Sequence, residues 1–155
     1  MKPRKYRKPK GRYLEHRVTT RIRFQEVDML GMVWHGHYLS YFEDARTAFG
    51  NKYGLNYSDI REAGLVAPVV QVSCDFLSQT EFADEIEIAA RLMCSKSPKI
   101  EFYYEVKRLS DSKLLATGTT IQAITDQQGR LILTVPDYLK DFYAKWENQM
   151  VSTDE

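Results

Sequence analysis

Asp28 and His35 are the side chains of this sequence best placed to do chemistry. They stand seven residues apart in the stretch EVDMLGMVWH, residues 26–35, with Gly31 between them. A carboxylate can serve as a nucleophile or as a general base, and an imidazole that titrates near neutral pH can share that role or orient a substrate. On these residues alone, the simpler interpretation of Asp28 is a loop acid that caps a helix or stabilises a turn around Gly31.

Two predicted elements would hold this pair in place. Residues 17–24 alternate polar and apolar side chains, which predicts a strand with one buried face. Residues 26–34 form a loop, and a helix with a broad apolar face is predicted from about residue 35 to residue 50. Its apolar positions, three and four apart, are Tyr38, Tyr41, Phe42, Ala45, Ala48 and Phe49. The first N–H groups of a helix are unpaired and partially positive, so they are a candidate oxyanion site beside Asp28.

The rest of the chain is predicted to form a sheet and a last helix. Residues 58–63 suggest a short second helix or turn, with Ser58 as its N-cap. The apolar period then changes to two, which predicts strands at residues 66–76, 86–92, 100–106, 114–125 and 131–134. Short polar connections favour an antiparallel sheet, and Pro136 suits the first turn of the final helix. One very apolar helix wrapped by one curved sheet gives an α+β fold.

The motif around Asp28 resembles a known family. The run Asp28-Met29-Leu30-Gly31-Met32-Val33-Trp34-His35-Gly36-His37-Tyr38, followed by Tyr41-Phe42-Glu43-Asp44-Ala45-Arg46, is similar to the signature of hot-dog fold acyl-CoA thioesterases of the 4-hydroxybenzoyl-CoA thioesterase family. It is most similar to the branch associated with the Tol-Pal system, whose spacing His35 also matches. The resemblance implies a hot-dog fold and hydrolysis of an acyl-CoA to free acid and CoA. It also implies a homodimer or homotetramer, with active sites between subunits.

The resemblance also implies roles for individual residues. Asp28 would be the nucleophile or general base, His35 an auxiliary catalytic residue, and the amide of His35 or a near neighbour the oxyanion donor. Tyr38 would line the acyl pocket or tie the loop to the helix, although an aromatic side chain at this spacing is more often part of the core. The expected substrate-binding residues are Gly31, Val33, Trp34, Tyr38, Glu43, Ser97 and Lys99.

Glu43 and the turn that contains Ser97 each have a competing interpretation. In another hot-dog thioesterase family an acid on the central helix attacks the thioester, but here Asp28 already fills that role. We therefore expect Glu43 to pair with Arg46 or with a neighbouring strand. The turn at residues 95–99 carries Lys96 and Lys99, which suit the phosphates of coenzyme A. A solvated basic hairpin is an equally good interpretation of that turn.

Other functions find less support in the sequence. A non-catalytic module that binds acyl-CoA or acyl-carrier protein on the same fold is the main alternative, although such a module would be expected to lose Asp28. A hot-dog dehydratase is weakly supported. The sequence has no glycine-rich phosphate loop or serine-centred elbow, and its three histidines have no metal-ligand pattern. We expect no metal, no cofactor beyond the coenzyme A of the substrate, and two buried free thiols, Cys74 and Cys94.

Length and charge place these features in one domain. A chain of 155 residues with 43% hydrophobic content can bury a core, and we expect a single domain at residues 17–147 with a flexible C-terminus at 148–155. Residues 1–12 carry seven Lys and Arg and no acid, which leaves 15 bases against 21 acids in the remainder. We expect residues 1–16 to be a disordered basic tail, without nucleic-acid binding. With no apolar run long enough to span a membrane, we expect a cytoplasmic protein.

Overall fold

The structure, a computed structural model, describes residues 8–153. β1 (Arg12–Arg21) leads through a 3-10 turn and a loop to the long helix α1 (His37–Tyr53), and α2 (Tyr57–Glu62) follows. The remaining strands and helix are β2 (Leu65–Val66), β3 (Val69–Phe76), β4 (Glu85–Met93), β5 (Lys99–Arg108), β6 (Leu114–Ala123), β7 (Thr125–Asp126), α3 (Asp137–Trp146) and β8 (Val151–Ser152).

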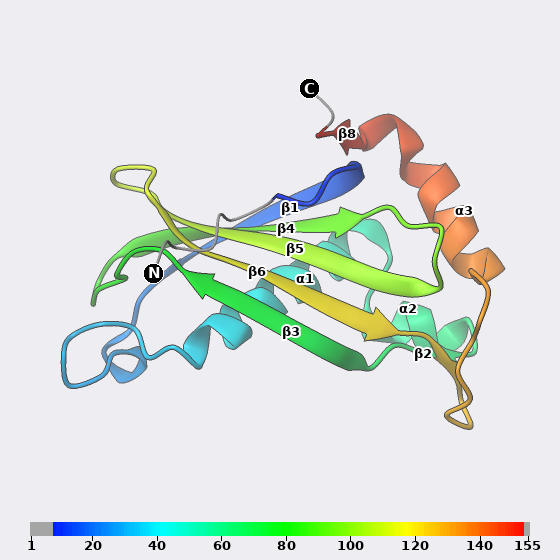
Figure 1. Cartoon of the computed structure of the whole chain (residues 1–155), viewed down its shortest axis with the longest axis horizontal. Coiled ribbons are helices and arrows are strands. Elements are labelled where there is room, and N and C mark those ends of the chain that lie inside the picture. Colours follow the sequence, from blue (N-terminus) through cyan, green and yellow to red (C-terminus); the bar gives the residue numbers. More distant parts are fainter. Residues whose placement is uncertain (1–7, 154–155) are drawn as a thin grey trace, which may run out of the picture.

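Six of the strands form one antiparallel sheet, in the order β3-β6-β5-β4-β1-β8. β2 and β7 pair separately. Figure 1 shows α1 running along one face of the sheet. In this view α3 lies to the right of the sheet, and β3 forms the lower edge of the sheet. The predicted arrangement of one long helix on a curved antiparallel sheet is therefore confirmed.

The core lies between α1 and the inner face of the sheet. The Phe42 ring stacks on Tyr104 with centroids 4.5 Å apart, and Phe49 meets Phe102 edge-on at 5.0 Å. Gly118 on β6 lets Phe42 approach, because a Cβ at that glycine would lie 2.3 Å from the Phe42 ring. Aromatic side chains of one helix face, rather than its intrinsic propensity, thus fix α1 to the sheet.

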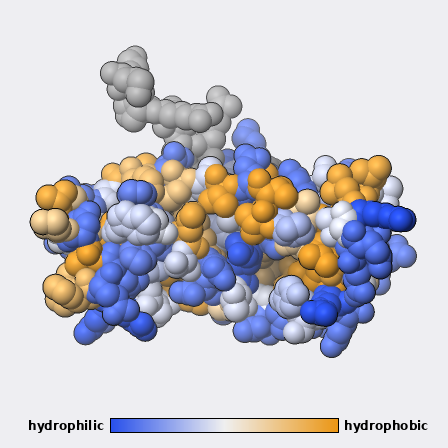
Figure 2. All heavy atoms as spheres, turned by 90° about the horizontal axis from the view of Figure 1, so that it is seen from below, coloured by the Kyte–Doolittle hydropathy of each residue, from blue (hydrophilic) through white to orange (hydrophobic). Residues whose placement is uncertain are grey.

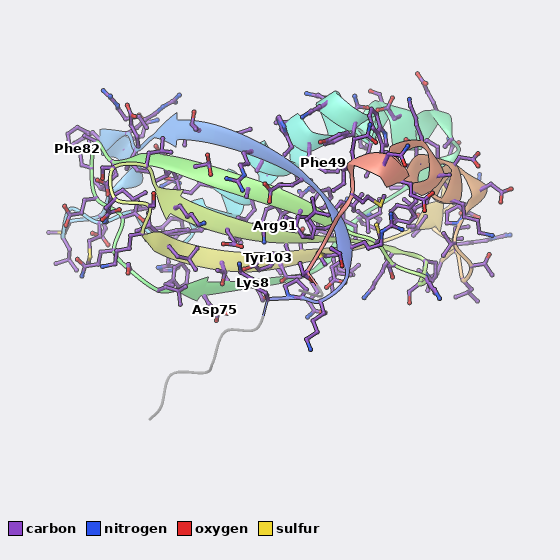
Figure 3. The ribbon with its side chains drawn as sticks, turned by 90° about the horizontal axis from the view of Figure 1, so that it is seen from above. Lys8, Phe49, Asp75, Phe82, Arg91 and Tyr103 are labelled. Atoms are coloured by element: carbon purple, nitrogen blue, oxygen red, sulfur yellow. The ribbon has the colours of Figure 1, made fainter. Side chains whose placement is uncertain are left out.

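The outer face of the sheet carries a network of charges. The Arg91 guanidinium lies 2.6 Å from a Glu15 carboxylate oxygen and 2.7 Å from one of Glu105, and Lys8 reaches Glu105 at 3.5 Å. Figure 3 shows Arg91 and Tyr103 side by side on neighbouring strands, and the Arg91 guanidinium lies over the Tyr103 ring. Burial raises the pKa of Glu15, but hydrogen bonds from Arg91 and Arg17 outweigh it and hold that pKa below its ordinary value.

Several predicted boundaries are wrong. β1 begins at Arg12 instead of residue 17, and residues 151–152 form β8, which pairs with Arg12 and Tyr13. Of the rest of the predicted basic tail, residues 8–11 precede β1 without helix or strand, and residues 1–7 lie outside the described residues. The strand predicted at 66–76 is divided into β2 and β3 around Pro68, and residues 131–134 contribute only a bridge from Leu131 to Thr125. The ends of these strands are set by pairing between segments that are distant in the sequence. The local alternation of polar and apolar residues contains no information about that pairing.

Candidate active site

Asp28 stabilises the loop between β1 and α1. Its Oδ1 accepts hydrogen bonds from the amides of Leu30 at 2.8 Å and Met32 at 3.4 Å, and its own amide donates to the Met32 carbonyl. Gly31 closes the turn with φ +76°, a left-handed conformation that glycine adopts without strain. The Oδ2 atom makes no hydrogen bond within residues 8–153, and the side chain is exposed. One oxygen of this carboxylate is therefore used for structure and the other is available.

Three further contacts hold the loop against the body of the protein. The Val33 amide donates to the Thr80 carbonyl at 2.8 Å, and the Trp34 amide donates to the Glu26 carbonyl at 2.9 Å. The Tyr41 hydroxyl, on α1, donates to Glu26 Oε2 at 2.8 Å. Burial and the neighbouring Glu26 carboxylate both raise the pKa of Tyr41, so its phenol stays protonated as a donor. The loop is thus tied both to α1 and to the segment after β3.

A cavity of about 360 Å³ opens beside this loop. Asp28, Val33, His35 and Tyr38 all line it, together with Met32 and residues 76–80. The Tyr38 hydroxyl shares a hydrogen bond of 2.8 Å with the hydroxyl of Thr80, and burial raises the pKa of Tyr38. The structure therefore brings both predicted catalytic side chains, and two of the predicted binding residues, to a single cavity.

The start of α1 supplies backbone donors close to these side chains. Its N-cap is Gly36, which has no side chain to cap the helix. The amides of His37 and Tyr38 bond to the carbonyls of Trp34 and His35, at 3.0 and 3.4 Å. Within the described part of the chain, the amides of His35 and Gly36 make no hydrogen bond. These two N–H groups are consequently free to bind an oxyanion.

The other predicted binding residues do not lie at this cavity. Trp34 is half-exposed and packs against the ring of His35 at 5.0 Å, outside the cavity lining. Ser97 lies in the β4–β5 turn and Lys99 begins β5, where it is 3.2 Å from Glu101. Lys99 pairs with Ala123, whose amide bonds to the carbonyl of Pro68, at the end of β3 opposite to Phe76. In one chain, Ser97 and Lys99 are thus far from Asp28.

Glu43 lines a second and larger cavity, of about 510 Å³. This cavity lies between the C-terminal half of α1, α2 and the strand segment at residues 65–69, and Arg46 also lines it. The expected pairing of Glu43 is wrong, because it forms no ion pair within residues 8–153. Arg46 instead donates from Nη1 to the Tyr104 hydroxyl at 3.3 Å. The two side chains are close in sequence but do not neutralise each other within the chain.

Comparison with known families decides the class of protein. The chain matches the Thioesterase-like superfamily over residues 22–143, which includes the Asp28 loop, α1 and strands β3 to β6. The chain belongs to this superfamily. Its fold is the hot-dog thioesterase fold, and membership supports thioester hydrolysis as the general activity.

Individual relatives agree with this placement at the level of the fold. The solved 1,4-dihydroxy-2-naphthoyl-CoA thioesterase of Synechocystis superposes with a TM-score of 0.74 at 16% identity, over 88% of this chain and 98% of that one. A DHNA-CoA thioesterase of Staphylococcus aureus gives 0.70 at 20% identity, over 87% of each chain. The chloroplastic acyl-acyl carrier protein thioesterase ATL3 of Arabidopsis thaliana is 21% identical over 90% of this chain and 73% of its own.

The part of this candidate site that follows β3 is not predicted from the sequence. Thr80 is buried and contacts both Tyr38 and Val33, whereas the sequence predicts only a short polar connection between two strands here. The run Ser78-Gln79-Thr80, directly after the apolar end of a strand, was the available signal. The role of this segment depends on its contact with Val33, which is 47 residues earlier in the sequence, so the hydrophobic periodicity does not reveal it.

Other chemistries find no site in the described part of the chain. Burial raises the pKa of the Cys74 thiol to about 12, so this half-buried cysteine is not a thiolate nucleophile at neutral pH. Among residues 8–153, no group of His, Cys, Asp and Glu side chains is arranged to hold a metal ion. None of the helices formed by these residues has the length and apolarity needed to cross a bilayer.

Proposed function

We propose that this protein is an acyl-CoA thioesterase in which Asp28 is the catalytic carboxylate and the start of α1 binds the oxyanion. One observation carries the proposal: Asp28, a carboxylate with a free oxygen, lines the same cavity as His35, and the unpaired amides of His35 and Gly36 lie directly before α1. His35 lines that cavity too and is assigned an auxiliary role. The substrate class follows from the superfamily and from the motif around Asp28.

The chemistry needs little beyond these groups. In one route, the Asp28 carboxylate adds to the thioester carbonyl, coenzyme A leaves as a thiolate, and water hydrolyses the resulting mixed anhydride. In the other, Asp28 takes a proton from water as that water adds to the carbonyl. Either route puts negative charge on the carbonyl oxygen, which the amides of His35 and Gly36 would stabilise. A thiolate leaves readily, so a strong general acid is not required.

The proposed enzyme is a homodimer joined through β3. This strand is an edge of the sheet with large exposed apolar side chains, including Val70 at 62% and Phe76 at 54% exposure. Figure 2 looks onto this side of the molecule and shows apolar groups gathered at several places along it. An open apolar edge favours pairing with another strand, and a second copy offers the same edge. The alternative homotetramer would add contacts between two such dimers.

Pairing of β3 with β3 would also complete the site. The cavity that holds Asp28 is lined by Phe76, and the larger cavity is lined by Val69, at opposite ends of this strand. In an antiparallel pair, the Phe76 end of one chain lies beside the Val69 end of the other. The two cavities would then join across the interface. The partner's larger cavity would bring its Glu43 toward the acyl-CoA bound at Asp28, and the turn beside that cavity would bring Ser97 and Lys99.

The remaining assignments follow the motif. Val33 and Tyr38 would contact the acyl group, Gly31 would shape the catalytic turn, and Trp34 would cover the site from the solvent side. The spacing from Asp28 to His35 supports the Tol-Pal-associated branch of the 4-hydroxybenzoyl-CoA thioesterase family. A cytoplasmic location suits a substrate carried on coenzyme A, and the proposed reaction uses no cofactor besides the coenzyme A of the substrate.

The direct test is release of free thiol from a panel of short, long and aromatic acyl-CoAs, with the matching acyl-carrier-protein thioesters as a second panel. We expect release from at least one acyl-CoA, well above the spontaneous rate. Faster release from the carrier-protein thioesters would change the substrate class. Tight acyl-CoA binding by titration without any release would establish the non-catalytic binding module instead.

A further inference from the structure

Glu43 and Arg46 are the charged side chains in the lining of the larger cavity. Neither forms an ion pair within residues 8–153, and Arg46 is half-buried with only the Tyr104 hydroxyl as its hydrogen-bond partner. The rest of the lining is apolar or neutral, which includes Thr47, Asn51 and Gln122. A half-buried guanidinium without a counter-charge is costly, and it becomes more so if another molecule covers the cavity.

The position of Glu43 and Arg46 along the sheet can be read from the contacts of α1, beginning with Phe42, the residue before Glu43. The Phe42 ring packs on Gly118, and Gly118 pairs with Cys74 of β3. Phe42 is therefore level with Cys74.

Arg46 lies one helical turn after Phe42, and its contacts place it along β3 in the same way. It contacts the Tyr104 hydroxyl, which is 2.7 Å from the hydroxyl of Thr120, and Thr120 pairs with Val72. Arg46 is therefore level with Val72. Residues 42–46 of α1 thus lie alongside the middle of β3, a strand that runs from Val69 to Phe76.

The dimer proposed above fixes what faces this part of α1. A two-fold axis that pairs β3 antiparallel with its copy passes near the middle of the strand and relates the two α1 helices as antiparallel neighbours. The axis then lies level with the stretch from residue 42 to residue 46. When the axis passes between residues 44 and 45 of both helices, residue 43 of one helix faces residue 46 of the other.

We propose that Glu43 of each subunit pairs with Arg46 of its partner, which gives two reciprocal ion pairs across the two-fold axis. This inference rests on the proposed β3 dimer and adds a role that the superfamily match does not assign. The pairs compensate the charges that dimer formation would otherwise bury. They also place a polar barrier at the axis between the two composite sites of the dimer, so that each acyl group is confined to its own side of the axis.

The test uses two single charge reversals, Glu43→Arg and Arg46→Glu, with dimer dissociation measured by sedimentation velocity and native mass spectrometry. Each homodimer then has like charges opposed at both pairs, and we expect its dissociation constant to rise roughly tenfold or more. An equimolar mixture of the two variants opposes two arginines with two glutamates. It should form a heterodimer in preference to either homodimer, with stability close to that of the parent.

Asp44→Arg is the matched control. It makes the same charge change as Glu43→Arg at the adjacent, exposed position of α1, which does not line the cavity. Dimerisation of this control should match the parent. If Arg46→Glu does not fold without its bond to Tyr104, Glu43→Arg alone keeps that bond and still opposes like charges at both pairs. Weaker dimerisation of Glu43→Arg beside an unchanged Asp44→Arg then tests the proposal.

The outcomes separate this inference from the proposed function. Reversals that leave dimerisation unchanged, or a mixture that shows no preference for the heterodimer, would overturn the ion pairs. A parent protein that is monomeric at micromolar concentration would overturn them as well. None of these readouts uses thioester hydrolysis, so the catalytic role of Asp28 stands or fails by its own test.

Discussion

Asp28 combines a structural and a proposed chemical role, and the two use different oxygens. Oδ1 accepts two backbone hydrogen bonds that hold the turn at Gly31, and Oδ2 is left for the substrate or for water. A carboxylate fixed in this way loses little freedom when it reacts, which favours catalysis. The interpretation of Asp28 as a loop acid and its interpretation as a catalyst are therefore compatible.

His35 provides the first prediction at the scale of single residues. Its imidazole lines the cavity but makes no hydrogen bond within the described part of the chain, so we assign it orientation of the substrate. His35→Ala should lower kcat by less than the roughly 100-fold that marks removal of a general base. Steady-state kinetics on the best acyl-CoA measures this, with His37→Ala as the control. A loss as large as that of an Asp28 variant would mean that the two residues share the base role.

At the scale of elements, the close approach of α1 to β6 positions the site. A Cβ at Gly118 would lie 2.3 Å from the Phe42 ring and 2.9 Å from the Ser73 carbonyl oxygen. Because neither the buried ring nor the backbone can move freely, Gly118→Ala should lower the free energy of unfolding by about 1–3 kcal/mol. Denaturant unfolding measures the change.

Gly36→Ala is the comparison for that prediction. A Cβ there would also meet a ring, that of Trp34 at 2.2 Å, but Trp34 is 50% exposed and can swing away. Its cost should be within about 0.5 kcal/mol of zero. Equal costs for the two variants would show that the packing of Phe42 on β6 is not tight.

The elements were predictable where their pattern is local. Spacings of three and four in the α1 segment and alternation in the segments of β4, β5 and β6 follow from one buried face each. The break at Pro68, the burial of Thr80 and the pairing of β8 with β1 depend on contacts between distant segments. The same limit applies to the site: a motif located Asp28 and His35, whereas the separation of Glu43, Ser97 and Lys99 from them appears only in three dimensions.

At the scale of the whole molecule, the proposed active site requires two copies of the chain joined at β3. Val72 lies at the middle of this edge and is 43% exposed. Val72→Lys would place a charge in the proposed interface and should raise the dimer dissociation constant roughly tenfold or more. Thioester hydrolysis should fall with it, because each proposed site takes residues from both chains.

Leu109→Lys is the control for this prediction, since Leu109 has the same exposed fraction, 43%, but follows β5, away from β3. It should leave both dimerisation and activity unchanged. Full activity of a monomeric Val72→Lys protein would show that one chain contains a complete site.

Asp28→Asn gives the most direct test of the central claim. The amide keeps the size of the side chain and an oxygen for the Leu30 amide, but it cannot attack a thioester or take a proton from water. Asp126→Asn is the matched control, because Asp126 also accepts hydrogen bonds from two amides of its own turn, those of Gln128 and Arg130.

The measurement is kcat for free-thiol release from the best acyl-CoA, with binding of that acyl-CoA measured in parallel. We predict a loss of roughly 100-fold or more for Asp28→Asn, with binding retained and with Asp126→Asn equal to the parent. An Asp28→Asn protein that hydrolyses the thioester as fast as the parent would contradict the account.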